Sequence, residues 1–276
     1  MESNLLSGLK DKVVLVTGGT RGIGLCTALS FAGLGAKCVI TYHWGTAEHD
    51  QVLKEFEAAG AKHPPLILQA DVSNHDDTVA LMKKIGETHD GVDAFISNVS
   101  LTSVIQSLED YSFRALKKSL AYSAWPTYEY VKRMKAAFGR YPKYVVGIST
   151  TGIDHYNFGY DYVAASKVAM ESLCRYMTYR LRNEDIHINI IRTRGVRTWS
   201  MEKTFGEEFL GFAKHFMHER HWMQPKEVAD ATVALCSGFL DGMKGQIVNV
   251  DRGMSFFDNL MHFYTKRESF GLRFED

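Results

Sequence analysis

The chain has 276 residues, of which 45% are hydrophobic and 23% charged, the composition of an ordinary globular protein. Its 32 Lys and Arg balance its 32 Asp and Glu, so no overall positive field attracts nucleic acid or anionic lipid, and we expect neither as a partner. No apolar run approaches membrane-spanning length, and the first eleven residues hold no signal-peptide stretch. The cysteines form no CxxC pair, as is typical of a reduced cytoplasmic protein. We therefore expect a cytoplasmic protein without a membrane segment.

Short apolar runs alternate with longer helical patterns along the whole chain. The predicted strands are 12–17, 37–42, 65–70, 92–97, 143–149, 187–192 and 246–250. The predicted helical regions are 22–34, 46–59, 76–88, 107–138, 161–182 and 201–237. This alternation predicts a doubly wound α/β fold of the Rossmann type with a parallel sheet. No linker or repeat divides the chain, so we expect a single domain over 1–276.

A glycine-rich segment, TGGTRGIG, lies between the first strand and the first helix. Backbone N–H groups at a helix N-terminus bind a dinucleotide pyrophosphate where no Cβ obstructs it. In such a turn Gly18 allows the tight exit from the strand, Gly22 the close approach of phosphate, and Gly24 the packing of helix on strand. A plain glycine turn is the alternative, but the place in the α/β pattern favours a cofactor site. The expected cofactor contacts are Gly18, Thr20, Arg21, Gly22, Ile23 and Gly24.

The TGxxxGxG spacing resembles that of the short-chain dehydrogenase/reductase superfamily, and further segments resemble its motifs in the same order. Asp71-Val72 is similar to the pair whose acid contacts adenine, and 97–100 (SNVS) is similar to an NNAG motif that keeps only Asn98. The segment 246–253 (QIVNVDRG) resembles the closing strand. The resemblance covers nearly the whole chain. It implies an oxidoreductase with a nicotinamide cofactor bound near Asp71, Val72 and Asn98.

The end of the second predicted strand indicates which cofactor is used. An NAD site usually places a carboxylate there to accept bonds from the ribose hydroxyls, but the chain has no acid between Thr41 and Glu48. Arg21 in the glycine turn has a guanidinium that can pair with a 2′-phosphate bidentately. We therefore expect NADPH, bound by Arg21 with the help of His43. A solvated Arg21 without a ligand is the alternative.

The segment 159–167 (GYDYVAASK) holds the expected catalytic residues. Superfamily reductases usually pair a Tyr with a Lys four residues later, and Val163 occupies that Tyr position here. On a helix Tyr160 falls within about 20° of the Lys167 face, whereas Tyr162 lies roughly 140° away. We therefore expect Tyr160 to be catalytic and Lys167 to lower its phenol pKa. The resemblance implies that Lys167 also holds the nicotinamide ribose.

The Tyr-x6-Lys spacing resembles that of the enoyl-acyl carrier protein reductases within this superfamily. The segment 119–123 (SLAYS) is similar to a helix of that branch, and Thr198 matches a Thr that contacts the nicotinamide carboxamide. Two positions depart from the pattern: Thr150 replaces a second Tyr, and Arg194 stands where Gly is usual. Thr150 also occupies the place of the catalytic Ser of ordinary ketoreductases, while strand alternation turns Ser149 the other way. Thr150 either donates a hydrogen bond to a substrate oxygen or satisfies the backbone at the strand end.

Aromatic residues after the sixth strand are the expected substrate contacts. Phe205, Phe209, Phe212 and Phe216 share one face of a predicted helix, and the resemblance implies a lid over the active site at about 198–224. An aromatic lid favours an apolar acyl chain, although such a stripe is also typical of a helix core. Three histidines follow at three-residue spacing, but we expect no metal. The expected substrate contacts are Tyr162, Trp199, Phe205 and Phe209.

An aromatic C-terminal extension, about 254–276, follows the last strand and is expected to be buried against a neighbouring subunit or the pocket mouth. We expect a homodimer or a homotetramer. The sequence predicts NADPH-dependent reduction of an α,β-unsaturated acyl thioester, in fatty-acid or specialised metabolism, with an acyl carrier protein as one candidate carrier. The alternatives are an NADPH-dependent carbonyl reductase, acting on a 3-ketoacyl or polyketide group, and a non-catalytic nucleotide-binding protein of the same fold.

Overall fold

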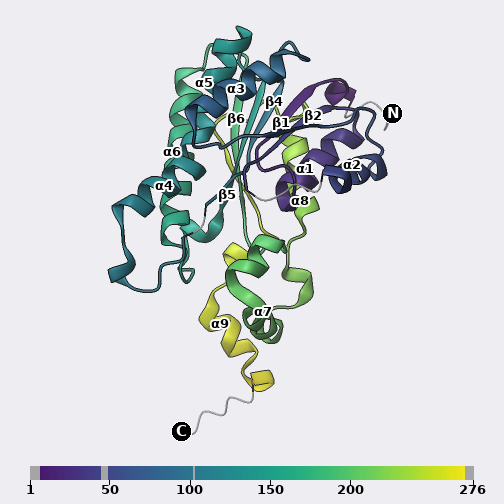
Figure 1. Ribbon diagram of the computed structural model, residues 1–276. Coiled ribbons are helices and arrows are strands. Elements are labelled where there is room, and N and C mark those ends of the chain that lie inside the picture. The colour runs from purple at the N-terminus through teal and green to yellow at the C-terminus, as the bar shows by residue number, and fades with distance from the viewer. Residues whose placement is uncertain (1–6, 45–48, 102, 271–276) are drawn as a thin grey trace.

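A parallel sheet of seven strands forms the centre of the computed structural model, which describes residues 7–44, 49–101 and 103–270 (Figure 1). The strands are β1 (Val13–Val16), β2 (Lys37–Tyr42), β3 (Leu66–Gln69), β4 (Ala94–Ser97), β5 (Tyr144–Thr150), β6 (His187–Thr193) and β7 (Ile247–Val250). Their spatial order is β3-β2-β1-β4-β5-β6-β7, and all pairs are parallel. The order reverses between β1 and β4, where doubly wound folds bind their ligands. The predicted doubly wound sheet is confirmed.

Helices cover both faces of this sheet. The helices of the described residues are α1 (Gly22–Gly33), α2 (His49–Ala58), α3 (His75–Gly86), α4 (Phe113–Ser123), α5 (Trp125–Phe138), α6 (Asp161–Arg180), α7 (Trp199–Phe216), α8 (Pro225–Leu235) and α9 (Asn259–Thr265). In β1, Val14 and Val16 pack with α1, α2 and α8, whereas Leu15 packs with α3, α5 and α6 (Figure 1). Because both faces are buried, the strand is a continuous apolar run.

Two predicted helical regions are each divided into two helices. The region 107–138 forms α4 and α5 with a break at Ala124, and 201–237 forms α7 and α8. A proline stands in the first turn of the second helix in each case, Pro126 in α5 and Pro225 in α8. Proline lacks the N–H group that would continue the preceding helix, but it fits a first turn well.

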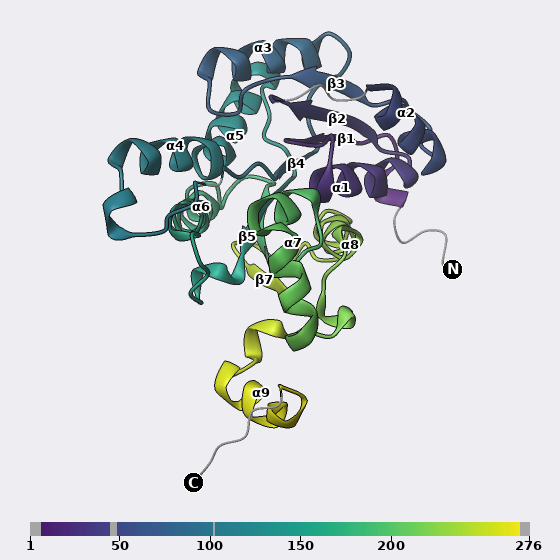
Figure 2. The same cartoon turned by 60° about the horizontal axis from the view of Figure 1, so that its bottom comes forward.

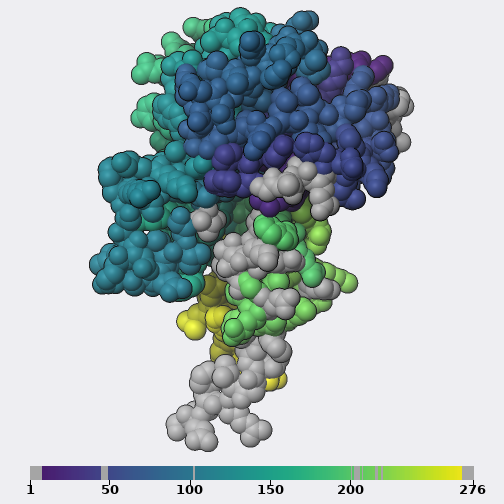
Figure 3. All heavy atoms as spheres, viewed as in Figure 1, coloured from purple at the N-terminus to yellow at the C-terminus, as the bar shows by residue number. Residues whose placement is uncertain are grey.

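The C-terminal segment leaves the body of the molecule. α7 lies below the sheet, and α9 projects beyond α7 (Figures 1 and 2). The space-filling view shows the described part of this segment extending past the remaining surface (Figure 3). Several of its side chains are therefore exposed in the single chain, including Phe256 (92%) and Leu260 (75%). Their predicted burial against a neighbouring subunit or the pocket mouth stays a prediction. Within the described ranges, no helix combines the length and the apolar character needed to cross a membrane.

Candidate active site

A cavity of about 500 Å³ opens at the carboxyl ends of the central strands. Its wall includes residues of the loops after β1, β2, β3, β4, β5 and β6, with residues of α7 on one side. The predicted site residues on this wall are Gly18, Thr20, Arg21, Gly22, Ile23, His43, Val72, Asn98, Thr150, Tyr160, Lys167, Thr198, Trp199 and Phe209. Gly24, Asp71 and Tyr162 are not part of the wall, and the side chain of Phe205 lies outside the described side chains.

The glycine turn brings the N-terminus of α1 to the cavity. Gly18 and Gly22 have φ values of +63° and +58°, which favour glycine. A Cβ at Gly24 would lie 2.3 Å from the carbonyl oxygen of Gly18, so α1 packs directly against the turn, as the spacing predicted. Arg21 occupies the N-cap position of α1 and makes no side-chain cap. The first amides of α1 are therefore left for an anion, and this geometry fits a pyrophosphate.

Asn98 fastens this turn to the neighbouring strand. Its side-chain amide donates hydrogen bonds to the carbonyl oxygens of Thr17 (3.0 Å) and Gly18 (3.3 Å). Its backbone N–H donates to the Thr17 hydroxyl at 3.1 Å. Asn98 thus forms part of the wall and also holds the glycine turn in place, a positioning role that the motif alone did not indicate.

Asp71 and His43 face each other at the end of the cavity near β2 and β3. The Asp71 carboxylate lies 3.3 Å from His43 Nε2 and accepts hydrogen bonds from Ser73 and Tyr122, both at 2.8 Å. Burial opposes ionisation of Asp71, but these hydrogen bonds outweigh it and lower its pKa. Trp44 stacks on the Tyr122 ring at a centroid distance of 5.1 Å. Because Asp71 is turned toward Tyr122, its predicted contact with the cofactor stays a prediction.

Arg21 stands at the boundary between the cofactor turn and α7. Its guanidinium carbon lies 4.8 Å from the centroid of the Trp199 ring, within the range of a cation–π contact. Arg21 is exposed, and both residues line the cavity. The contact links the residue predicted to bind phosphate to the first residue of α7, which lies within the predicted lid.

Tyr160 lies on the cavity wall beside Thr150. It is the N-cap residue of α6, with φ −101° and ψ 6°, so the helical rotation that favoured it does not strictly apply. Burial raises the pKa of Tyr160, and a hydrogen bond with Thr150 opposes this rise. The Thr150 hydroxyl also accepts the backbone N–H of Gly152 at 3.0 Å. Thr150 thus satisfies the backbone at the strand end and also lines the cavity, so both of its expected roles remain possible. The sequence predicted a lowered pKa for the Tyr160 phenol, whereas the structure gives a raised one.

Lys167 is buried, with 3% of its surface exposed, and its Nζ donates to the carbonyl oxygen of Val99 at 3.5 Å. Burial lowers its pKa to about 8, although Cys174 and Glu171 act in the opposite direction. Lys167 and Tyr160 line one cavity, but no effect of the Lys167 charge on the Tyr160 phenol accompanies this arrangement. The pKa of Tyr160 is instead governed by burial and by Thr150.

Tyr162 faces away from the cavity, contrary to its prediction as a substrate contact. Its hydroxyl donates to the carbonyl oxygen of Ser112 at 3.1 Å and accepts the Ser112 backbone N–H. Its ring also contacts that of Tyr111. Tyr162 thus joins α6 to the start of α4. The reason is its angular position on α6, far from the Lys167 face.

α7 forms one side of the cavity, but it is not the unbroken helix that the aromatic spacing assumed. Gly206, with φ +78° and ψ 170°, interrupts it between Phe205 and Phe209. The predicted single aromatic face is therefore wrong for residues on opposite sides of Gly206. Trp199, Met201 and Phe209 line the cavity from this element. Among the residues whose side chains are described, no group of three His, Cys, Asp or Glu is placed to hold a metal ion.

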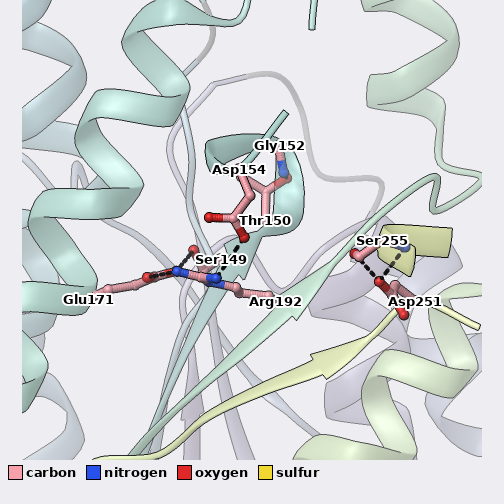
Figure 4. Close-up of polar contacts among 8 residues, drawn as sticks. All are labelled: Ser149, Thr150, Gly152, Asp154, Glu171, Arg192, Asp251 and Ser255. Atoms are coloured by element: carbon pink, nitrogen blue, oxygen red, sulfur yellow. Dashed lines mark hydrogen bonds and ion pairs between the residues drawn. The ribbon is translucent and has the colours of Figure 1, made fainter. Parts of the chain in front are cut away.

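Several wall residues and their supports were not predicted as site residues. Ser149 donates to buried Glu171 at 2.6 Å, and Glu171 is also paired with Arg192 (Figure 4). Asp251 accepts hydrogen bonds from the backbone N–H and the hydroxyl of Ser255, which lies in the short helical turn Met254–Phe256 (Figure 4). Single residues on separate loops form no repeating pattern from which a site could be predicted. The exception is Arg194, which stands out in the sequence as a residue that replaces the usual Gly. The unpredicted wall residues include Trp44, Tyr122, Asn157, Arg194, Met217, Trp222 and Met254.

This parallel sheet, with a glycine turn at α1 and a Tyr and a buried Lys in one cavity, defines an oxidoreductase of the short-chain dehydrogenase/reductase type. A family model described as enoyl-(acyl carrier protein) reductase matches residues 18–255, and the chain belongs to that family within the superfamily. Three solved structures share the fold, at 20–22% sequence identity. Levodione reductase matches with a TM-score of 0.81 and 20% identity, covering 90% of this chain and 99% of that chain. A short-chain dehydrogenase from Burkholderia cenocepacia, solved in complex with NADP, matches with a TM-score of 0.75 and 22% identity, covering 88% and 98%.

Two curated relatives act on acyl thioesters by name. The 3-oxoacyl-[acyl-carrier-protein] reductase of Synechocystis sp. is 27% identical over 91% of this chain and 100% of its own length. The 1-cyclohexenylcarbonyl-CoA reductase of Streptomyces collinus is 26% identical over 89% of this chain and 88% of its own length. A glucose and ribitol dehydrogenase homolog of Oryza sativa is 27% identical over 89% and 86%. The relatives therefore share oxidoreductase chemistry but differ in substrate.

Proposed function

We propose that the protein reduces the C=C bond of an α,β-unsaturated acyl thioester with NADPH. The observation that carries this proposal is the pair Tyr160 and Lys167, seven positions apart, on the wall of one cavity. Tyr162, the nearer tyrosine in sequence, is engaged by Ser112 and turned away. The match to the enoyl reductase family model supports the same reaction.

The residues of the cavity fit a dinucleotide. The uncapped N-terminus of α1 would receive the pyrophosphate, and Arg21 the 2′-phosphate of NADPH. Thr198 and Lys167 would hold the carboxamide and the ribose at the nicotinamide end, as the family resemblance implies. The Asp71 carboxylate, the nearest acid after β3, is turned to its own hydrogen-bond donors, the hydroxyls of Ser73 and Tyr122.

When bound, NADPH supplies a hydride for the β-carbon of the substrate. Tyr160 would donate its proton to the enolate oxygen that develops on the thioester. The resulting enol would then tautomerise, gaining a proton from solvent at the α-carbon and releasing the proton on oxygen, to give the saturated thioester. The raised pKa of Tyr160 keeps the phenol protonated at neutral pH, as a proton donor requires. Thr150 orients the Tyr160 hydroxyl, and the buried Lys167 holds the cofactor side of the site. Trp199 and Phe209 offer an apolar surface to the acyl chain.

Reduction of a carbonyl group is the second candidate. The Synechocystis relative, which the chain matches over its full length, is named as a 3-oxoacyl reductase, and Thr150 occupies the position of a ketoreductase Ser. NADPH oxidation should be measured with enoyl and 3-ketoacyl thioesters of equal chain length. Faster turnover of the enoyl series supports the first proposal. Faster turnover of the keto series replaces it with the second.

We also propose that the chain is one reductase domain, with a lid at about 198–224 and an extension at about 254–276, and that it forms a homodimer or homotetramer. The extension supports assembly because Phe256 and Leu260 are exposed in the single chain. A partner subunit would cover them. Coenzyme A and an acyl carrier protein are the two candidate carriers of the acyl group, and turnover of both thioesters at equal chain length distinguishes them.

A further inference from the structure

The segment from Thr150 to Tyr160 carries two of the reactive side chains on a loop. Thr150 is the last residue of β5, and the turn Thr151–Ile153 follows it. Tyr160 is the residue before α6 begins. Beyond Thr150 the segment has left the β5–β6 pairing. The relative positions of Thr150, Tyr160 and Lys167 therefore depend on side-chain contacts that hold this loop against α6 and β6.

Arg192 supplies those contacts from the neighbouring strand (Figure 4). It lies opposite Ser149 in the parallel pairing of β5 and β6. Its Nη1 donates to Asp154 Oδ2 at 2.9 Å, on the loop. Its Nε and Nη2 donate to the two carboxylate oxygens of Glu171 at 2.8 and 2.6 Å, on α6. A guanidinium fork of this kind fixes direction as well as distance.

Glu171 extends the same network to the catalytic helix and to β5. It lies one turn after Lys167 on α6, so the two share a helix face. Its Oε1 also accepts the Ser149 hydroxyl at 2.6 Å, immediately before Thr150. The Glu171 side chain is 6% exposed and that of Arg192 is 18% exposed. Neither these two residues nor Asp154 is part of the cavity wall, so each can act on the reaction only through the residues it holds.

We propose that Arg192, together with Glu171 and Asp154, is a positioning residue that sets the relative placement of Thr150, Tyr160 and Lys167. This inference rests on the reduction proposed above. The network ties β5, the loop, β6 and α6 at one point directly beside the three reactive side chains. Breaking one arm changes the alignment of the proton donor while leaving the binding surfaces intact. The expected signature is a loss in kcat without a matching change in KM.

Asp154→Asn tests this because it cuts the loop arm alone. Arg192 keeps both bonds to Glu171, so no buried charge loses its partner and the fold should survive. The matched control is Asp230→Asn. Asp230 pairs with Lys226 on α8 and is 56% exposed, close to the 51% of Asp154. Asp154→Glu restores a carboxylate within reach of Arg192 and serves as the rescue variant.

We expect Asp154→Asn to lower kcat by about five- to ten-fold, equivalent to about 1–1.4 kcal/mol, with KM and the NADPH Kd within about two-fold of the parent. Asp230→Asn should keep the parental kcat, and Asp154→Glu should recover most of it. Unchanged kcat in Asp154→Asn overturns the proposal. A lower kcat together with a higher KM and a lower Tm, without rescue by Asp154→Glu, also overturns the proposal. That pattern marks an ion pair with a purely structural role.

Hydrogen exchange separates this proposal from the proposed function. If the unmodified protein binds NADPH but reduces none of the enoyl or keto thioesters, the proposed function fails. Exchange of the peptide covering 150–160 then decides the positioning role. Faster exchange in Asp154→Asn than in Asp230→Asn supports it, and equal exchange in the two variants refutes it.

Discussion

Replacing Tyr160 or Tyr162 by Phe removes a single hydroxyl from two very different places. The Tyr160 hydroxyl is on the cavity wall beside Thr150, whereas that of Tyr162 bonds the backbone of Ser112 at the start of α4. Both changes keep the ring and its packing. Comparing the two variants therefore distinguishes a tyrosine that donates a proton from one that has a structural role, although the two lie only two residues apart.

The expected magnitudes follow from these contacts. Tyr160→Phe should lower kcat by about 10²-fold or more, about 2.7 kcal/mol, because a positioned general acid is lost. Tyr162→Phe loses two hydrogen bonds to Ser112, at about 0.5–1.5 kcal/mol each, and leaves backbone groups unpaired. Its Tm should fall by about 2–4 °C for each kcal/mol, with kcat within a few-fold of the parent.

Steady-state NADPH oxidation and thermal unfolding, measured on the same preparations, check both halves of this prediction. The NADPH Kd of Tyr160→Phe serves as its control, because the cofactor site should be intact. A parental kcat in Tyr160→Phe, with a large loss in Tyr162→Phe, would refute the geometric reasoning and remove the main support for enoyl reduction.

Three further results are expected. Because Arg21 faces the cavity at the glycine turn, the parent should bind NADPH about ten-fold or more tighter than NADH, about 1.4 kcal/mol, and Arg21→Ala should lose most of that preference in fluorescence titrations; equal Kd values in the parent would contradict this. Phe209→Ala should raise KM for long acyl chains more than for short ones, while a fall in Tm with unchanged chain-length preference would make Phe209 ordinary packing. Because Lys167 has a pKa of about 8 and loses its charge above it, kcat/KM should decline as the pH rises through about 8, and a constant kcat/KM to about pH 10, near the usual lysine pKa, would contradict this.

Much of the fold could be predicted because its strands and its cofactor turn each have a distinct sequence pattern. The continuous apolar runs of the strands follow from burial on both faces of the sheet, and the glycine turn at Gly18–Gly24 marks its own place in the topology. The division of 107–138 into two helices depended on Pro126, which reads equally well as a kink or as a first turn. The position of α9 could not be predicted, because an apolar pattern such as that around Leu260 does not say locally what it packs against, and Leu260 is exposed in the single chain.

Site residues could be predicted where a sequence motif specified their position. They were harder to predict where tertiary packing determines which way a side chain points. Tyr160 and Lys167 reach one cavity, although Tyr160 precedes the helix on which its selection was argued. Its phenol pKa could not be predicted, because burial outweighs any effect of the nearby lysine. The Arg192–Glu171 pair joins residues on β6 and α6 that only the strand pairing brings together.

The fate of deuterium from NADPH labelled at both C4 positions tests the central claim most directly. An enoyl thioester should be converted to the saturated thioester with one deuterium at the β-carbon. In Tyr160→Phe the deuterium should be transferred to the product at the same reduced rate as NADPH is oxidised. A 3-ketoacyl thioester of equal length should react more slowly. An unlabelled enoyl thioester recovered unchanged, while the keto thioester gains deuterium and becomes the alcohol, would contradict enoyl reduction.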